Sequence, residues 1–266
     1  MLLIDNHVHA GDKYGPVEDI IKNMDDHGVT HAVIVQHMGQ YNNSYLVECL
    51  DRYPDRLWAA CMVDLSLPDA PKTLKNWLKQ EGLHGVRLPA MTLSRRPDVW
   101  EAAAANHGVI SVAGLHGRDM GQIHRLKEFL EDFPRARLKL EHMAHPDPTM
   151  PPPYITYSRV MELAEYKNVY LQLTPPYAHS KQPYPYDDMK PFLDMARKHF
   201  GPYRLLWGSA FPSSERFIGY DQTIKWLDTL ELSDFQREQI VSLNALRLWD
   251  PRKKKVAIES GDAESE

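Results

Sequence analysis

LLIDNHVHAGDKYGPVEDIIKNMDDHG (residues 2–28) forms one strand–helix unit, and the rest of the chain repeats its pattern. The apolar run Leu2–Asn6 predicts a buried strand, and the amphipathic stretch Val17–His27 predicts a helix that ends at Gly28. The residues after the strand, Asp5–His9, do not match the GxGxxG loop that binds dinucleotide phosphates. The unit therefore predicts a parallel sheet covered by helices, without that nucleotide loop.

The strand–helix unit recurs eight times along the chain. Strands are predicted over Leu2–Asn6, His31–Gln36, Leu57–Val63, Gly85–Pro89, Val109–Gly114, Arg137–His142, Asn168–Thr174 and Tyr203–Gly208. Helices are predicted over Val17–His27, Ser44–Arg52, Leu74–Gln80, Val99–Asn106, Gln122–Phe133, Ile155–Tyr166, Asp187–His199 and Tyr220–Leu230. A last helix begins at Ser233, with Gln236 as its capping-box partner. Eight strands that are apolar on both faces favour a closed barrel over an open sheet.

The predicted fold class is α/β, as a single (β/α)8 TIM barrel with a C-terminal helix. Its length of 266 residues would allow two domains, but one barrel accounts for about 250 residues. We expect residues 1–250 to form the barrel domain. Residues 251–266 begin with Arg252–Lys255, end acidic, and are expected to be a disordered charged tail.

The composition predicts a soluble cytoplasmic protein. A net charge of −5 does not favour nucleic acid, which requires a basic face. Cys49 and Cys61 have neither disulfide-scaffold density nor metal-knuckle spacing, which favours a reducing compartment. We expect no signal peptide and no membrane span, because apolar runs are too short for either. Exposed aromatic-rich loops would allow a homodimer.

Two proline-rich segments are longer than minimal connections. Residues 146–153 follow the sixth strand and residues 175–185 follow the seventh. In a barrel such loops form walls or a partial lid over the site. Tyr177, His179 and Tyr184 in the second loop are therefore candidates to line a pocket.

Four histidines follow predicted strands at their carboxyl ends, where barrel enzymes place their chemistry. His7 and His9 are two residues apart in extended chain, so both imidazoles lie on one face. His116 follows the fifth strand, and His142 closes the sixth. We predict that the four bind a divalent metal, zinc by ligand type, that activates water. For the HxH pair alone, surface or capping histidines are the alternative.

Further polar residues are candidates for substrate contact. Arg87 lies within an apolar strand and needs a partner, either a substrate carboxylate or a neighbouring acid such as Glu141. His37 and Tyr41 follow the second strand, and Gln172 lies on the seventh. We predict that Arg87, His37, Tyr41 and Gln172 bind the substrate. His37 and Tyr41 could instead form part of the wall, and Gln172 could face a helix.

Short motifs spread over the chain carry a family resemblance. They are His7-Val8-His9, Asn43–Leu46, Tyr53–Arg56, Gly85–Leu88, Glu141–Met143 with Pro146-Asp147, Leu205–Ser209 and Asn244-Ala245. With them the chain resembles the amidohydrolase superfamily, in its amidohydrolase-related (amidohydrolase 2) branch of TIM-barrel hydrolases. The resemblance extends from residue 2 to about residue 249 and is closer to lactonase-like members than to decarboxylases. Some of those relatives work without a metal.

The motif after strand eight departs from the family at one position. The family has Gly-Ser-Asp or Gly-Thr-Asp before an aromatic residue and proline, whereas this chain has Gly208-Ser209-Ala210-Phe211-Pro212. The resemblance places the catalytic aspartate at position 210, where a methyl group cannot accept a proton. Loss of such a base commonly costs about 10²–10⁴ in rate. We favour an engineered Asp→Ala variant over a natural member with altered chemistry, because the neighbouring residues keep the enzyme pattern.

These features predict a metal-dependent hydrolase that opens a small cyclic ester or amide by attack of water. His142 would orient the water or stabilise the oxyanion, and the residue 210 carboxylate of the parent enzyme would take the proton. The expected partner is a small-molecule substrate that carries a carboxylate. Non-oxidative decarboxylation of an aromatic acid is one alternative. A non-catalytic barrel that binds small molecules is another, and Ala210 supports it.

Overall fold

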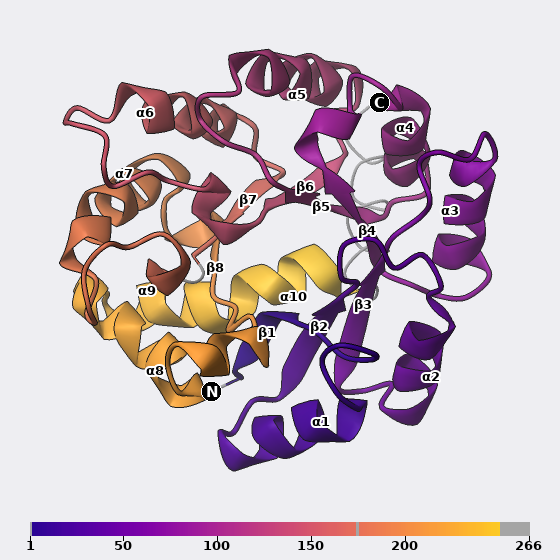
Figure 1. Cartoon of the computed structure of the whole chain (residues 1–266), viewed down its shortest axis with the longest axis horizontal. Helices are drawn as coiled ribbons and strands as arrows, with labels where there is room; N and C mark the ends of the chain where they lie inside the picture. The colour runs from indigo at the N-terminus through magenta and orange to yellow at the C-terminus, as the bar shows by residue number, and fades with distance from the viewer. Residues whose placement is uncertain (1, 174–175, 251–266) are drawn as a thin grey trace, which may run out of the picture.

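The computed structural model describes residues 2–173 and 176–250 as an eight-stranded parallel barrel surrounded by helices (Figure 1). The strands pair in chain order, which confirms the predicted (β/α)8 architecture. The strands are β1 (Ile4–Val8), β2 (His31–Val35), β3 (Leu57–Cys61), β4 (Gly85–Pro89), β5 (Val109–Ala113), β6 (Arg137–Leu140), β7 (Val169–Gln172) and β8 (Leu205–Leu206). The predicted tail at 251–266, and the predicted loop and strand residues 174–175, lie outside the described residues.

The helices follow the amphipathic stretches of the sequence. They are α1 (Val17–Asp26), α2 (Ser44–Arg52), α3 (Ala70–Lys79), α4 (Pro97–Ala105), α5 (Met120–Asp132), α6 (Ile155–Met161), α7 (Lys190–Phe200), α8 (Tyr220–Lys225), α9 (Asp234–Glu238) and α10 (Asn244–Trp249). The predicted capping box at the start of α9 is present, since the Ser233 hydroxyl accepts a hydrogen bond from the Gln236 amide. A π-helical turn, Gln239–Leu243, joins α9 to α10.

The barrel closes between β1 and the segment that follows β8. The Asn6 amide donates to the Trp207 carbonyl at 3.2 Å, and the Ala210 amide donates to the His7 carbonyl at 2.8 Å. Beneath them, the buried Asp5 carboxylate accepts hydrogen bonds from the Ser209 amide and the Tyr220 hydroxyl, each at 2.8 Å. Residues 7 and 210 are therefore direct neighbours across the closing seam.

A bulge in β1 turns the histidine pair toward the barrel interior. Pairing between β1 and β2 shifts register between Asp5 and Val8. As a result Ile4 packs inside the barrel whereas Val8, four residues later, packs in the layer beneath the helices. A regular strand would place both residues on one face. The bulge thus re-aims His7 and His9, a known use of β-bulges beside active sites.

The barrel interior has an apolar lower layer and a polar upper layer, and the polar layer contains the buried residues Arg87, Ser111, Lys139 and Glu141. The lower layer includes Val33, Trp58, Val109 and Leu206, and α10 adds Trp249 to it; Figure 1 shows α10 crossing behind the ring. A Cβ atom at Gly85 would meet the Val109 carbonyl oxygen at 2.3 Å, so this strand must carry glycine there. The apolar layer fills the interior at this end of the barrel.

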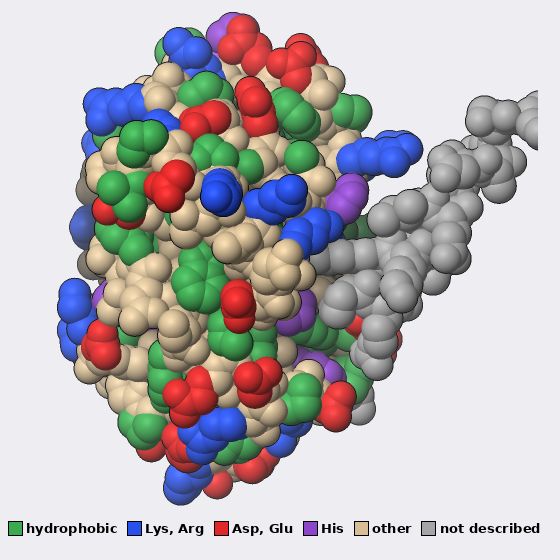
Figure 2. All heavy atoms as spheres, turned by 90° about the vertical axis from the view of Figure 1, so that its right-hand side faces the viewer, with side chains coloured by type: hydrophobic (Ala, Val, Ile, Leu, Met, Phe, Trp, Pro, Cys, Tyr) green, Lys and Arg blue, Asp and Glu red, His purple; other side chains and the backbone are tan. Residues whose placement is uncertain are grey.

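The outer surface is typical of solvated helices. On the face shown in Figure 2, basic and acidic side chains are interspersed rather than gathered into a field of one sign. Among the described helices, none combines the length and apolar character that crossing a bilayer requires.

Candidate active site

A cavity of about 450 Å³ opens at the carboxyl ends of the strands. We call it the first cavity. It is lined by His9, Lys13, Tyr14, His37, Met38, Arg87, His142, His145, Tyr177, Ala178, His179, Ala210, Ser213 and Phe217. These lining residues include lysine, arginine and histidine but no carboxylate. The cavity therefore favours an electron-rich or anionic ligand.

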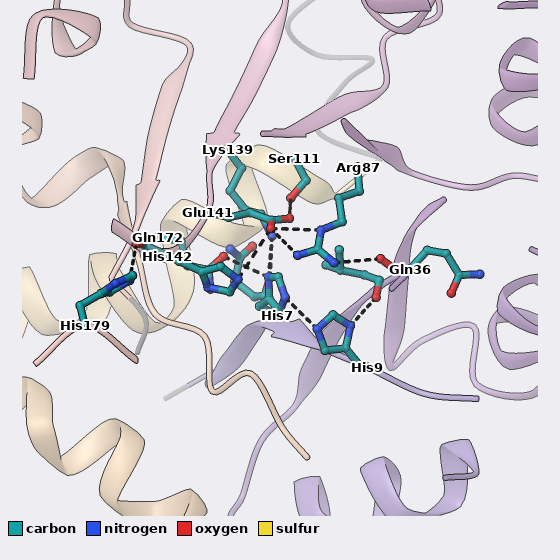
Figure 3. Close-up of polar contacts among 12 residues, drawn as sticks. His7, His9, Gln36, Arg87, Ser111, Lys139, Glu141, His142, Gln172 and His179 are labelled. Carbon is teal, nitrogen blue, oxygen red and sulfur yellow. Dashed lines mark hydrogen bonds and ion pairs between the residues drawn. The ribbon is translucent and has the colours of Figure 1, made fainter. Parts of the chain in front are cut away.

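His7 and His9 meet edge to edge at the base of this cavity. Their Nε2 atoms are 3.2 Å apart, and Figure 3 shows the two rings pointing toward each other. The His9 Nδ1 atom lies 2.6 Å from the Val35 carbonyl oxygen, so it carries the proton and leaves Nε2 as an acceptor. His7 Nδ1 lies 3.1 Å from Gln172 Oε1. If His7 Nδ1 also carries its proton, the Nε2 lone pairs of His7 and His9 point into the same small space.

The position of the His7 proton decides what the pair can do. Lys139, fully buried in β6, places Nζ 3.4 Å from His7 Nδ1 and 3.2 Å from the Asn6 carbonyl oxygen. If His7 Nδ1 accepts from this ammonium, its Nε2–H donates to His9 and the pair needs no metal. If Nδ1–H donates to Gln172, the two free Nε2 atoms suit a cation. The two arrangements differ in the position of this one proton.

A buried ion pair forms the far side of the polar layer. Glu141 Oε2 accepts from Arg87 Nε at 3.1 Å and Nη2 at 2.7 Å, and Oε1 accepts from the Ser111 hydroxyl at 2.7 Å. Burial by itself would raise the pKa of Glu141. The charges of Arg87 and Lys139 outweigh that effect and hold this pKa well below its usual range. Glu141 is thus an anion, and Arg87 already has a partner.

His142 lies on a segment with strained backbone, which also carries His145. Residues 142–145 all have left-handed backbone, with φ between 51° and 55°. Left-handed backbone is costly for residues with a Cβ, and such strain is concentrated at functional sites. The His142 ring lies 5.0 Å from the His7 ring, and its buried Nδ1 atom has no hydrogen-bond partner among the described residues. This nitrogen is available to a ligand.

Three further imidazoles continue outward from His142. His145 lies 5.8 Å from His142 and 5.2 Å from His179, measured between ring centroids, and it stacks on His116 at 4.5 Å. His179 Nε2 donates to the His142 carbonyl at 3.1 Å. Burial lowers the pKa of His145 and His179 to about 4 and that of His142 to about 3. These rings are neutral at physiological pH.

Acid should destabilise the protein through these neutral rings. In the unfolded chain histidine binds protons near pH 6.5, whereas folded His145 and His179 stay neutral down to about pH 4. Between those values the unfolded chain binds more protons. The free energy of unfolding therefore falls as pH drops below about 6.5, by up to about 1.4 kcal/mol per pH unit for each ring. Urea unfolding across this range measures the slope.

The matched variant is His145→Gln/His179→Gln, which removes two of the rings. Its loss of unfolding free energy on acidification should be smaller than that of the parent. Equal slopes in the two proteins would contradict the assignment of buried neutral imidazoles at these positions.

Six of the predicted site residues lie at the first cavity or in the histidine cluster at its base, and the other three lie elsewhere. His7, His9 and His142 come together, and His37, Arg87 and Ala210 line the first cavity. Gln172 is fully buried behind His7, where it contacts the imidazole, and Tyr41 is 42% exposed and does not line this cavity. His116 lines a neighbouring cavity, where it stacks on His145.

Lys139, Ser111, Tyr14 and His145 were not predicted from the sequence. Tyr14 stacks on His9 at 4.7 Å and belongs to the loop after β1. Lys139 could have been predicted from the sequence, because a charge within an apolar strand requires a buried partner, as argued for Arg87. His145 follows His142 by three residues, but only the left-handed backbone turns it toward the same cavity.

The donor set fits a divalent metal. Ligand atoms of His7, Glu141 and His142 all lie within 4.8 Å of one another. The 3.2 Å separation of the His7 and His9 Nε2 atoms is close to that of two tetrahedral zinc ligands at about 2.0–2.1 Å from the ion. The buried contacts on both Nδ1 atoms resemble the outer hydrogen bonds that orient metal-binding histidines.

Comparison with known proteins relates the chain to hydrolases. The sequence profile of the amidohydrolase family matches residues 9–250. An L-fucono-1,5-lactonase from Burkholderia ambifaria is 24% identical over 228 residues, which cover 81% of this chain and 77% of the relative.

Two solved structures show the same fold at lower identity. One is a probable 2-pyrone-4,6-dicarboxylic acid hydrolase from Acinetobacter baumannii with bound citric acid, with a TM-score of 0.77 and 22% identity over 93% of this chain and 99% of that chain. The other is an amidohydrolase from Burkholderia multivorans with bound zinc, with a TM-score of 0.76 and 20% identity over 93% and 99% of the two chains.

Proposed function

Because this chain belongs to the amidohydrolase family, we propose that it is a hydrolase that opens a small cyclic ester or amide by attack of water. The observation that carries the proposal is the meeting of His7, His9 and His142 beside one cavity, close to the backbone of residue 210. The ends of β1 and β6 place these neutral imidazoles where a carbonyl group can enter. The similarity to a lactonase favours a cyclic ester.

The chain's own side chains suggest how the substrate is held. The buried Arg87–Glu141 pair lines the cavity with a guanidinium, and His37 lies 5.7 Å from Tyr14 between ring centroids at its rim. A neutral imidazole at His142 can donate from one nitrogen and accept at the other. We assign His142 to orient the attacking water or to stabilise the oxyanion.

The reaction consumes one lactone and one water. Water adds to the carbonyl carbon, the ring C–O bond breaks, and the ring oxygen takes up the proton that the water gave up, which yields one hydroxy acid. In a parent enzyme with aspartate at position 210, that carboxylate would carry the proton between the two oxygens. We propose that Ala210 marks an impaired variant of such an enzyme.

A divalent ion would be held by His7, His9 and His142, with Glu141 close by. When bound, it would polarise the carbonyl group and acidify water. We expect about one equivalent of metal, zinc by ligand type, in protein purified without chelator. Elemental analysis measures it.

The matched pair for the metal experiment is His7→Ala, which should lose the metal, and His116→Ala, which should keep it. Absence of metal from the parent would contradict zinc chemistry and favour the metal-free state with Lys139 bonded to His7. Loss of metal in His116→Ala alone would contradict the proposed ligand set.

Product analysis tests the reaction itself. The chain and its Ala210→Asp variant would be incubated with sugar-acid lactones, pyrone dicarboxylates and aromatic carboxylic acids. Appearance of the ring-opened hydroxy acid supports the proposal. Release of CO₂ from an aromatic acid would instead indicate a decarboxylase. Binding without turnover by both proteins would indicate a non-catalytic barrel.

A further inference from the structure

A second cavity of about 530 Å³ adjoins the first. It lies among the segments that follow β5, β6 and β7, and its lining includes His116, Arg118, His145, Tyr157, His179 and Lys181. His145, Ala178 and His179 line both cavities. The two cavities are therefore neighbours that share this part of their lining.

A buried hydroxyl group in the second cavity lacks a partner. Tyr157 is 4% exposed and packs edge-on against Phe192, with ring centroids 5.1 Å apart. Its hydroxyl group makes no hydrogen bond within the part of the chain that the structure describes, and burial raises its pKa. Buried hydroxyl groups are normally hydrogen-bonded. A ligand that enters this cavity can supply the missing partner.

The second cavity has an excess of positive charge. Arg118 and Lys181 are exposed at its lining, and neither forms an ion pair with a carboxylate among the described residues. The lining carboxylate is Asp147, whose Oδ1 atom already accepts from the Thr149 amide at 3.0 Å and the Thr149 hydroxyl at 2.6 Å. Two cations thus face the opening with one carboxylate, Asp147, near them, which leaves an excess of one positive charge.

We propose that the second cavity binds a carboxylate group of the substrate. Arg118 and Lys181 would contact the carboxylate, and the Tyr157 hydroxyl group would donate a hydrogen bond to it. Arg87 is less suited to this role, because Glu141 already occupies its Nε and Nη2 donors. The inference rests on the proposed function and deepens it: the substrate is an acid whose carboxylate lies away from the ester carbonyl.

The probes are benzoate and its neutral analogue benzamide, which differ in charge and suit the aromatic lining. Calorimetric titration of the full chain should show tighter binding of benzoate. Arg118→Gln should weaken benzoate binding about fivefold, and Arg118→Gln/Lys181→Gln about twentyfold, as loss of exposed ionic contacts predicts. Benzamide binding should not change. Arg135→Gln, an exposed arginine that lines neither cavity, is the matched control.

Tyr157→Phe removes only the hydroxyl group and should weaken benzoate binding severalfold, with unfolding curves confirming that the variant folds. Equal benzoate affinity in the unaltered chain and the double variant would overturn the proposal. So would a loss of benzoate affinity in Lys13→Gln alone, since Lys13 lines the first cavity. Failure to bind benzoate at millimolar concentration would also overturn it. These measurements need no turnover, so their failure is separate from failure of the proposed hydrolase activity.

Discussion

The Ala210→Asp variant is expected to open its lactone substrate at least about 10²-fold faster than the chain itself, and up to about 10⁴-fold faster. The reason is the lack of a carboxylate among the residues that line the first cavity. Glu141 cannot take this role, since both of its oxygens are held by Arg87 and Ser111. Measurement of kcat for both proteins, with a lactone that the Ala210 chain binds, would check the gain.

The backbone at position 210 also favours the aspartate. Ala210 has φ 59°, a left-handed conformation that asparagine and aspartate adopt more readily than alanine. Its amide is fixed by the His7 carbonyl at 2.8 Å. A carboxylate introduced there would therefore be held beside the histidine pair without new backbone strain.

The matched control for this gain is Ala210→Asn. Asparagine has nearly the same shape as aspartate and tolerates the same backbone, but its amide cannot act as a base. The Asn variant should fold like the Asp variant, and its kcat should remain as low as that of the Ala210 chain. If Ala210→Asp shows no gain with any substrate that binds, position 210 does not carry the missing base and the impaired-variant proposal fails.

The barrel could be predicted from the sequence because its signals are periodic and local. The bounds of β4 and α2 agree with the prediction at both ends. The first strand was placed two residues too early, because apolar character marks Leu2–Asn6 while the bulge extends pairing to Val8. A bulge depends on how two strands meet, and one strand's sequence does not show it.

The meeting of His7, His9 and His142 could be predicted because strand ends converge in a barrel. His116 could not be placed in the same way. The loop after β5 begins at Gly114, with φ 66°, and packs so closely that a Cβ at Gly117 would lie 2.0 Å from the Thr156 carbonyl oxygen. This contact takes the loop toward α6, and His116 with it. Loop direction depends on such tertiary contacts.

The largest stability loss is expected for Glu141→Gln, at about 3–5 kcal/mol. The Glu141 side chain is fully buried and Arg87 is 8% exposed. The glutamine cannot neutralise Arg87, so a guanidinium and the Lys139 ammonium would share a low-dielectric interior without their anion. Chemical unfolding of both proteins at neutral pH measures the difference.

The pH dependence of this difference has a definite sign. The folded pKa of Glu141 is depressed below its unfolded value of about 4.5, so its contribution is complete above that pH and is lost as the solution is acidified further. The gap between parent and variant should thus narrow below about pH 4.5. Glu162→Gln, which breaks the exposed Lys127–Glu162 pair of 3.0 Å, is the control and should cost less than about 1 kcal/mol. If both variants lost the same small free energy of unfolding, the Arg87–Glu141 pair would not stabilise the polar layer. An unpaired cation in the interior should cost several kcal/mol, about 3–5.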